Sequence, residues 1–344
     1  MGARGWSQFL FVAAGMTIAL SPPAFAAADS HFFAGKTVTV VIGLPPGGGY
    51  DAYGRLLQRH FGDHIPGRPR VVATNMPGAG SMAAANYIYN TAPSDGTVVG
   101  IFSSSAAMEP LMGDKQAKFN PSKFGWVGSM SQDVSYCGVW AKPGVPTTFK
   151  EMLKKQIVMG AGAPAAITYQ HPMVLKNVLG AKFKIIPGYR GTADLNLAMQ
   201  RGEINASCGM FSSSIETHWA NELKSGKLKL FLQMGAKRSH EFGNVPSAFD
   251  FAKSAQDKSV LDLEFGSLLL SRPVATSPKI PAQRLEILRK AFLATMKDKS
   301  FLADAKKMGL TIDPAPGAQV KKLLARFSAF PPQILQKAQH AIGR

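Results

Sequence analysis

The feature that most constrains the fold is a regular alternation of short apolar runs with longer, helix-length segments after residue 36. Short runs rich in Val, Ile and Leu are typical of buried strands. An order of strand, helix, strand, helix predicts mostly parallel sheets covered by helices on both faces, an α/β fold. We expect strands at 36–43, 70–75, 97–102, 156–160, 182–187, 204–210, 228–234 and 267–271, and helices at 53–64, 81–90, 193–201, 282–297, 300–308 and 317–327.

The length of the chain predicts two domains. Without residues 1–26 it has about 318 residues, more than one core usually holds. No flexible linker divides it, so we expect two close crossovers between the domains, at 124–139 and 263–272. The first domain would then comprise 27–133 plus 267–344 and the second 134–266, with a hinge between them.

The N-terminus has the pattern of an export signal. Arg4 precedes an uncharged apolar run at 9–20, a Ser-Pro-Pro break at 21–23, and the small-x-small sequence Ala24-Phe25-Ala26. The run is shorter than the roughly 20 apolar residues of a membrane span, which disfavours the alternative of an uncleaved anchor. We therefore expect a signal peptide at 1–26 and a mature protein in the periplasm.

The chain is strongly basic, with a net charge of +18. Removing residues 1–26 takes away only Arg4, which leaves 38 basic residues against 21 acids, or +17. The basic residues are spread along the sequence and no RNA-binding or zinc-finger motif accompanies them, so a nucleic-acid partner is not expected. A small anionic ligand suits this charge.

The two cysteines, Cys137 and Cys208, both lie in apolar, strand-like segments. In an oxidising compartment they could form one disulfide. Two buried free thiols are the alternative, and the sequence leaves both open.

Four Gly-rich loops follow predicted strands and precede predicted helices, at 44–51, 75–82, 160–164 and 188–192. In open α/β sheets ligands bind beyond the carboxyl ends of strands, where helix N-termini offer N–H groups and a positive dipole end to an anion. Two loops fall in each expected domain, so together they predict a cleft with helix starts on both walls. For the first loop alone, a tight turn with Asp51 stabilising the helix start is the alternative.

Catalytic, cofactor and metal motifs are not found among these loops. The first loop lacks the Gly-Lys-Ser/Thr ending of a P-loop, and Gly160-Ala-Gly162 lacks the third glycine of a dinucleotide fingerprint. Ser129 is not in a GxSxG elbow, and no paired carboxylates stand at the loops. His171 is expected in a structural role, and His60 and His64 on a solvated helix face rather than at a metal. We expect a binding protein without a cofactor or metal, and not an enzyme.

Five segments resemble the tripartite tricarboxylate transporter receptors, the Bug-type periplasmic solute-binding proteins. They are GGGYD at 47–51, NMPGAGS at 75–81 with AANYIYNTAPSDGT at 84–97, GYRGTADLNLAMQRGEI at 188–204 and SRPVATSPKIPAQRLEILRKAF at 271–292. The resemblance implies a type II-like, two-domain periplasmic binding protein that closes on a small carboxylate. Together with the loops, it implies ligand contacts from Pro46, Gly47, Gly48, Gly49, Asp51, Gly78, Ala79, Gly80, Ser81, Ser104, Gly162, Ala163, Thr168, Tyr189, Gly191, Thr192 and Asp194.

The third loop departs from the family pattern, because alanines stand where Gly and Ser are usual and Thr168 is the nearest hydroxyl. This predicts a less polar wall, suited to a ligand with an aromatic or aliphatic body. Asp51 would repel a bare anion, so we expect it to orient water, bind a ligand donor group or support the helix.

The function implied is capture of a di- or tricarboxylate or an aromatic acid and its delivery, by a monomeric receptor, to membrane subunits of a tripartite tricarboxylate-type transporter. A periplasmic sensor that presents the same ligand to a signalling partner is the alternative. Both outputs need a closed, liganded form, and neighbouring genes for transporter subunits or for a sensor would separate them.

Overall fold

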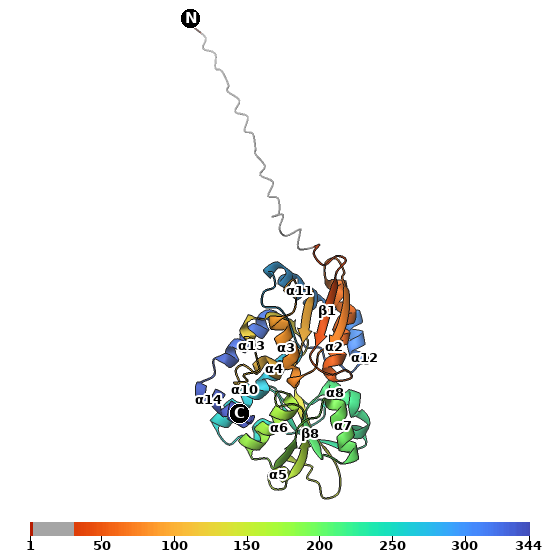
Figure 1. Ribbon diagram of the computed structural model, residues 1–344, viewed down its shortest axis with the longest axis vertical. Helices are drawn as coiled ribbons and strands as arrows, with labels where there is room; N and C mark the ends of the chain where they lie inside the picture. The colour runs from red at the N-terminus through yellow and green to blue at the C-terminus, as the bar shows by residue number, and fades with distance from the viewer. Residues whose placement is uncertain (3–30) are drawn as a thin grey trace.

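The computed structural model describes residues 1–2 and 31–344, so the predicted signal peptide at 1–26 lies outside the described residues apart from its first two. Two sheets form the framework, and each has its own set of flanking helices (Figure 1). The first sheet contains β1 (Thr37–Ile42), β2 (Arg70–Asn75), β3 (Val98–Ile101), β4 (Gly125–Ser129), β10 (Pro273–Thr276) and β11 (Ala315–Pro316). The second contains β5 (Ser135–Trp140), β6 (Ile157–Gly160), β7 (Phe183–Ile186), β8 (Ala206–Phe211) and β9 (Leu228–Met234).

The two sheets share one strand order. The first is β11-β4-β10-β3-β1-β2 and the second is β7-β6-β8-β5-β9. In the first sheet the parallel strands β2, β1 and β3 are followed by the antiparallel β10 and then by β4, which is parallel to the three. In the second sheet β7, β6 and β8 are likewise followed by the antiparallel β5 and then by β9. The antiparallel strand is the one that has just crossed from the other sheet. The predicted mostly parallel α/β sheets are thus confirmed, with one reversed strand inside each and β11 reversed at an edge.

Helices fill the connections between the strands. Those next to the first sheet are α2 (Gly49–His64), α3 (Met82–Asn90), α4 (Ser104–Met108), α11 (Ala282–Thr295), α12 (Lys299–Lys307) and α13 (Gly317–Ser328). Those of the second are α5 (Phe149–Met152), α6 (Ile167–Leu179), α7 (Thr192–Arg201), α8 (Ser212–His218), α9 (Ala220–Lys224) and α10 (Ala255–Gly266). Short 3₁₀ turns are η1 (Ala79–Ser81), η2 (Pro121–Lys123), η3 (Ala248–Phe251) and η4 (Ser267–Leu270).

The last helix, α14 (Pro332–Ala341), packs against α6 and α10, beside the second sheet (Figure 1). The largest apolar cluster accordingly runs from the first sheet through α6, α10 and α14 to one face of the second sheet. A smaller cluster around Met199 and Trp219 covers the other face, beneath α7 and α8. The helices behind the two sheets therefore form one continuous core.

The strand predicted at 267–271 is wrong, because these residues form η4 and the strand follows at Pro273. A short apolar run reads equally well as a strand or as a buried helical turn, and periodicity cannot separate the two. Helix α2 also begins four residues earlier than expected, at Gly49, since two glycines of the first loop precede the helix and the third is its first residue.

The strands of the first sheet come from 37–129 and 273–316, and those of the second from 135–234. Two connections between strands therefore pass from one sheet to the other, close to the predicted crossovers. They are bonded to each other, since Met130 N donates to Arg272 O at 3.0 Å and Asp133 N donates to Leu268 O at 3.0 Å. The division into 27–133 plus 267–344 and 134–266 stays a prediction, and α14, which it assigns to the first domain, packs against α6 and α10 of the second sheet's set.

Candidate ligand-binding site

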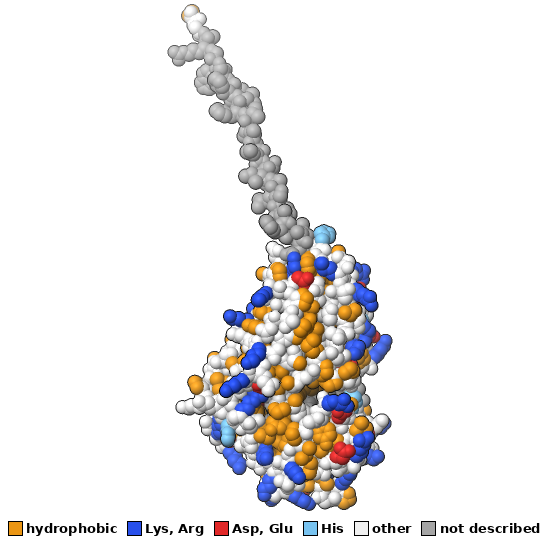
Figure 2. All heavy atoms as spheres, viewed as in Figure 1, with side chains coloured by type: hydrophobic (Ala, Val, Ile, Leu, Met, Phe, Trp, Pro, Cys, Tyr) orange, Lys and Arg blue, Asp and Glu red, His pale blue; other side chains and the backbone are white. Residues whose placement is uncertain are grey.

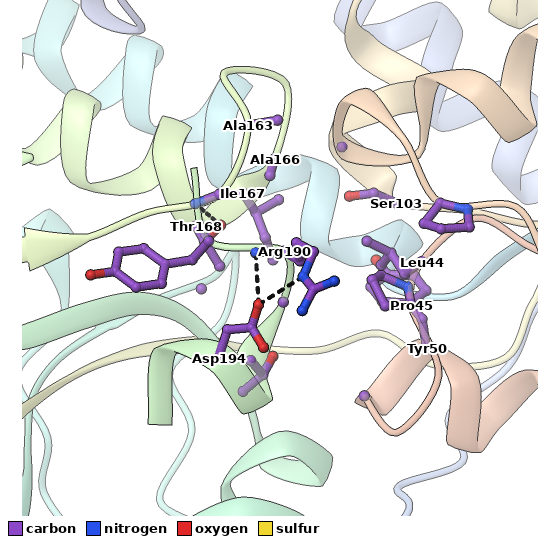
Figure 3. A pocket seen from close by; sticks show the side chains of 18 of the residues that line it. Leu44, Pro45, Tyr50, Ser103, Ala163, Ala166, Ile167, Thr168, Arg190 and Asp194 are labelled. Carbon is purple, nitrogen blue, oxygen red and sulfur yellow. Dashed lines mark hydrogen bonds and ion pairs between the residues drawn. The ribbon is translucent and has the colours of Figure 1, made fainter. Parts of the chain in front are cut away.

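A cavity of about 730 Å³ lies between the two sheets, at the ends of strands from both. Loops and helix starts form its walls, and Figure 3 shows Leu44, Pro45, Tyr50 and Ser103 facing Ala163, Ala166, Ile167 and Thr168 across it. The first wall, from the first sheet, consists of Leu44, Pro45, Pro46, Gly48, Gly49, Tyr50, Pro77, Gly78, Ala79, Gly80 and Ser103. The second wall, from the second sheet, consists of Gly162, Ala163, Ala166, Ile167, Thr168, Gly188, Tyr189, Arg190, Gly191, Thr192, Ala193, Asp194, Gly209, Phe211 and Ser214.

Five helices begin at this cavity, and none is capped by the side chain of its own N-cap residue, although Ser104 N of α4 donates to the Tyr50 hydroxyl at 3.4 Å. Their N-cap residues carry no capping hydrogen bond: Gly48 of α2, Ser103 of α4, Ala166 of α6, Gly191 of α7 and Phe211 of α8. Helices that begin elsewhere are of both kinds: Thr148, Ser254 and Asp298 cap α5, α10 and α12, whereas α3, α9, α11, α13 and α14 have no side-chain cap. Because the first N–H groups of a helix have no partner within it, the uncapped starts offer donors to a ligand.

The first loop is held in shape by Asp51. Its carboxylate accepts hydrogen bonds from Gly47 N at 3.0 Å, Arg55 Nε at 3.0 Å and Asn75 Nδ2 at 2.9 Å. Burial by itself raises the pKa of Asp51, but the hydrogen bonds from Arg55, Gly47 and Asn75 outweigh burial and hold the pKa below its usual range. Asp51 is buried and is not among the lining residues. Of the three roles expected for Asp51, this position fits support of the helix rather than orienting water or binding a donor group of the ligand.

The second loop brings the two walls into contact. The backbone of this loop has positive φ at four successive residues, Gly78, Ala79, Gly80 and Ser81. Residues other than Gly rarely adopt this conformation. A Cβ on Gly80 would lie 2.6 Å from Ala165 C and Ala166 N of the second wall. Ser105 Oγ also donates to Ala165 O at 2.9 Å. Gly80 thus allows a backbone-to-backbone approach that no larger residue permits.

Three hydroxyls of the lining, those of Thr168, Ser103 and Tyr50, have hydrogen-bond partners, whereas those of Tyr189, Thr192 and Ser214 have none among the described residues. Thr168 Oγ1 accepts from Gly162 N at 3.0 Å, and Ser103 Oγ lies 2.8 Å from Ser105 Oγ. The Tyr50 hydroxyl accepts from Ser104 N at 3.4 Å. These bonds fix the loops and engage the N–H groups of Gly162 and Ser104. The donors left to a ligand are the other N–H groups at the helix starts and the hydroxyls of Tyr189, Thr192 and Ser214.

Arg190 and Asp194 are the charged side chains in the lining. Arg190 Nε and Asp194 Oδ2 lie 3.3 Å apart, and Figure 3 shows the Arg190 side chain extending from the second wall toward the first. The Arg190 side chain is 87% exposed, so it can leave Asp194 at little cost. The lining as a whole carries no excess charge.

The floor of the cavity rests on a buried cation. Tyr50 from the first wall and Phe211 from the second meet edge to face, with ring centroids 6.3 Å apart. The guanidinium of Arg272 lies 4.4 Å from the Tyr50 ring centre, 4.1 Å from that of Phe211 and 4.6 Å from that of Tyr53. Each distance is in the range of a cation–π contact.

Arg272 also ties the floor to the two crossovers. It lies on the returning crossover and its Nη2 is 3.5 Å from the carboxylate of Asp133 on the outgoing one. Both side chains are buried, and Nη2 also donates to Ser213 Oγ of α8 at 3.3 Å. The Arg272 guanidinium therefore contacts both walls, and it joins the returning crossover to the outgoing one.

The structure places most of the predicted site residues at the cavity. The exceptions are Gly47, Asp51, Ser81 and Ser104, which are not in the lining. Ser81 Oγ is buried and donates to Gly43 O at 2.9 Å, and Ser104 lies behind Ser103, which takes the lining position. The residues that do line the cavity are Pro46, Gly48, Gly49, Gly78, Ala79, Gly80, Gly162, Ala163, Thr168, Tyr189, Gly191, Thr192 and Asp194.

Sequence reasoning missed the apolar and aromatic part of the lining. Leu44, Pro45 and Tyr50 adjoin the first loop and could have been included from their neighbours. Ile167 and Phe211 reach the cavity at the starts of α6 and α8, where nothing in the sequence separates them from core residues.

Three histidines considered from the sequence, His171, His60 and His64, lie away from the cavity, and His64 contacts Asp298 at 3.3 Å. His171 is buried, with Nδ1 3.0 Å from Ser135 Oγ, and burial lowers its pKa to about 3, so the ring is neutral. His60 contacts Asp304 at 3.1 Å between α2 and α12. In the part of the chain that the structure describes, no group of three or more His, Cys, Asp or Glu side chains could hold a metal.

Cys137 and Cys208 form a disulfide between the adjacent strands β5 and β8. The question that the sequence left open is therefore answered in favour of the bridge. Such bonds persist in oxidising compartments.

A curated protein resembles this chain in sequence over most of its length. The chain is 27% identical over 282 residues to the Cupriavidus necator UPF0065 protein in the gbd 5′ region, covering 78% of each chain. A scan against protein-family models finds no match.

Solved structures share the fold over almost their whole length. A TctC solute-binding protein from Polaromonas is 21% identical, covering 88% of this chain and 98% of that one, with a TM-score of 0.60. The periplasmic binding protein BugD is 18% identical, covering 88% and 97%, with a TM-score of 0.67. MatC from Rhodopseudomonas palustris, with bound malate, is 16% identical, covering 89% and 99%, with a TM-score of 0.68. The resemblance read from the loop motifs is thus confirmed in the fold.

Proposed function

We propose that this chain, which shares its fold with TctC and BugD solute-binding proteins, is a periplasmic receptor that binds a small carboxylate between its two sheets. The observation that carries the proposal is the set of uncapped helix starts around one cavity, contributed by both sheets. N–H groups and dipole ends that converge from two sides favour an anion. The malate bound to MatC is a ligand of this class.

Binding closes the two domains, 27–133 plus 267–344 and 134–266, about the crossovers. A ligand can stabilise the closed state only through contacts that both walls make in that state. The N-termini of α2 and α7 supply such contacts, one from each wall. The direct contact of Gly80 with Ala165 and Ala166 supports a closed arrangement of the walls.

The cavity is suited to binding rather than to catalysis. Its charged side chains are Arg190 and Asp194, which pair with each other, and the hydroxyls of Thr168 and Tyr50 accept from loop backbone. A nucleophile needs a neighbouring base, and the buried His171 lies outside the lining. The receptor therefore acts by capture and release.

The receptor works in the periplasm and as a monomer. The signal pattern at 1–26 and the disulfide between Cys137 and Cys208 support export to an oxidising compartment. Among the residues that the structure describes, no helix combines the length and apolar character of a membrane span. After release from the cavity, the ligand passes to the membrane subunits of a tripartite tricarboxylate-type transporter.

A thermal-shift screen of the purified mature protein tests this function. The panel contains mono-, di- and tricarboxylates and aromatic acids, each with its uncharged amide as a control. At about 100 times its dissociation constant, a ligand adds about 2.7 kcal/mol of stability. A rise in Tm with at least one acid, and not with its amide, is expected. If no acid raises the Tm and the protein as purified holds no acid, the proposal fails.

A further inference from the structure

The cavity is larger than a malate-sized anion requires. Its volume of about 730 Å³ lies in the upper half of the range of roughly 300–1,000 Å³ in which proteins enclose drug-sized molecules. A four-carbon diacid would leave much of the space to water. The size indicates a ligand with a substantial body beside its anionic group.

The surface that such a body would meet is apolar on both walls. The first wall contributes Leu44, Pro45 and Pro77, and the second contributes Ile167 and Phe211. Figure 3 shows Leu44 and Pro45 opposite Ile167. These side chains have no polar group to offer a second carboxylate, but apolar atoms of a ligand lose water when they contact them.

Several polar side chains of the lining are already engaged, although the hydroxyls of Tyr189, Thr192 and Ser214 have no hydrogen-bond partner in the part of the chain that the structure describes. Thr168 holds Gly162 N, Ser103 holds Ser105, and Arg190 is paired with Asp194. The lining has one cation, Arg190, and one carboxylate, Asp194, so it offers no excess positive charge to several carboxylates, and a carboxylate placed against the apolar surface loses its hydration without new partners. The lining therefore favours one carboxylate and disfavours several.

We infer that the ligand is a monocarboxylate with a bulky aromatic or alicyclic body. Its carboxylate lies at the helix starts, and its body lies between Leu44 and Pro45 on one side and Ile167 and Phe211 on the other. The inference rests on the proposed function, because it assigns a ligand class to the same cavity.

Calorimetric titration of the full mature protein with a matched set of acids tests the ligand class. The probes are 2-naphthoate and 4-phenylbutyrate, compared with malate, adipate and citrate, and 2-naphthamide controls for the charge. We expect at least one of the two aromatic acids to bind about 100-fold more tightly than any of the polyacids, and the amide to bind far more weakly than 2-naphthoate.

A pair of variants on one helix tests the place of the body. Ile167→Ser removes an apolar side chain from the lining, whereas Val178→Ser makes the same kind of change at the far end of α6, outside the lining. Ile167→Ser is expected to weaken 2-naphthoate or 4-phenylbutyrate about tenfold or more, and Val178→Ser to leave binding unchanged. Circular dichroism melting of both variants shows whether each is folded.

The outcomes separate this inference from the proposed function. Tighter binding of malate, adipate or citrate than of both aromatic acids overturns the ligand class and leaves the carboxylate receptor standing. Equal loss of binding in folded Ile167→Ser and Val178→Ser variants also overturns it, because the body would then not contact Ile167. A protein that binds no acid in the panel, and holds none as purified, contradicts both.

Discussion

The two walls of the cavity are built on the same strand order but differ in their side chains. The first wall has no charged side chain and consists largely of Gly, Ala and Pro around Leu44 and Tyr50. The second adds Arg190, Asp194 and Thr168 to a similar set of small residues. What the walls have in common is uncapped helix starts, at α2 and α4 in the first and at α6, α7 and α8 in the second.

This difference indicates which groups bind the anion and which select among ligands. An anion can be bound by what both walls share, the backbone N–H groups, while the side chains of the second wall and the apolar patches adjust the choice of ligand. The net positive charge fits the same view, because on the face shown in Figure 2 Lys and Arg are spread out rather than gathered in one place. Charge brings anions near, and the helix starts hold one.

Replacing Arg272 breaks the connection between the walls and should have the largest effect. Arg272→Met removes the cation from Tyr50 and Phe211 and leaves Asp133 buried without its partner. Breaking a buried ion pair costs about 3–5 kcal/mol, so chemical denaturation should show a loss of that size. Arg272→Met with Asp133→Asn should recover part of it, since no unpaired charge remains. A single variant as stable as the wild type would mean that the guanidinium does not hold the floor.

Gly80→Ala keeps each wall intact but prevents their contact. Its Cβ would meet backbone atoms of Ala165 and Ala166, which cannot move aside as a side-chain tip can. Binding of the tightest acid should fall about 100-fold, or about 2.7 kcal/mol, by calorimetry.

Gly226→Ala is the matched control for this variant, because Gly226 has a similar positive φ of 71° and open space around it. Both substitutions incur the cost of a left-handed residue, about 1–2 kcal/mol, but only one lies between the walls. Equal binding by the two variants would show that contact of the walls is not needed.

Gly48→Val tests the first wall alone. Gly48 has φ of −94°, which any residue adopts, and an added Cβ would lie 4.0 Å from its nearest neighbour, Pro45 O. The branched side chain should crowd the N–H groups at the start of α2 and weaken binding about tenfold or more, with the Tm little changed. The affinity of the Gly48→Ala variant should lie between those of the wild type and Gly48→Val. Unchanged binding in Gly48→Val would reduce the first loop to a turn.

Arg190→Gln tests the charge of the second wall and should have the smallest effect. The side chain is exposed and already paired with Asp194, and exposed pairs contribute little. We expect binding to weaken less than about threefold, and the salt dependence of the affinity to decrease slightly. A loss of 30-fold or more would transfer recognition from the backbone to this side chain.

The fold was predictable from sequence because it depends on local patterns. Strands such as β1, β2 and β9 end within a residue of their expected bounds, since apolar runs between turn residues specify them. The conformation of residues 267–271 was not predictable, because the sequence Ser-Leu-Leu-Leu-Ser has no period that separates a strand from a buried helical turn.

The Gly-rich part of the site was predictable for a similar reason. A glycine run between a strand and a helix marks a close approach of backbone to ligand or to another loop, as at Gly48 and Gly80. The floor was not predictable. Tyr50, Phe211 and Arg272 are far apart in the sequence, and only the return of the chain from the second sheet to the first brings them together.

The central claim, that the ligand carboxylate is held by helix starts of both walls, is tested most directly by a crystal structure of the complex with the tightest acid of the panel. The account predicts carboxylate oxygens within about 3.2 Å of backbone nitrogens at the starts of α2 and α7, with the body of the acid against Ile167 and Leu44. A carboxylate that contacts only the guanidinium of Arg190, or only one of the two walls, would contradict it.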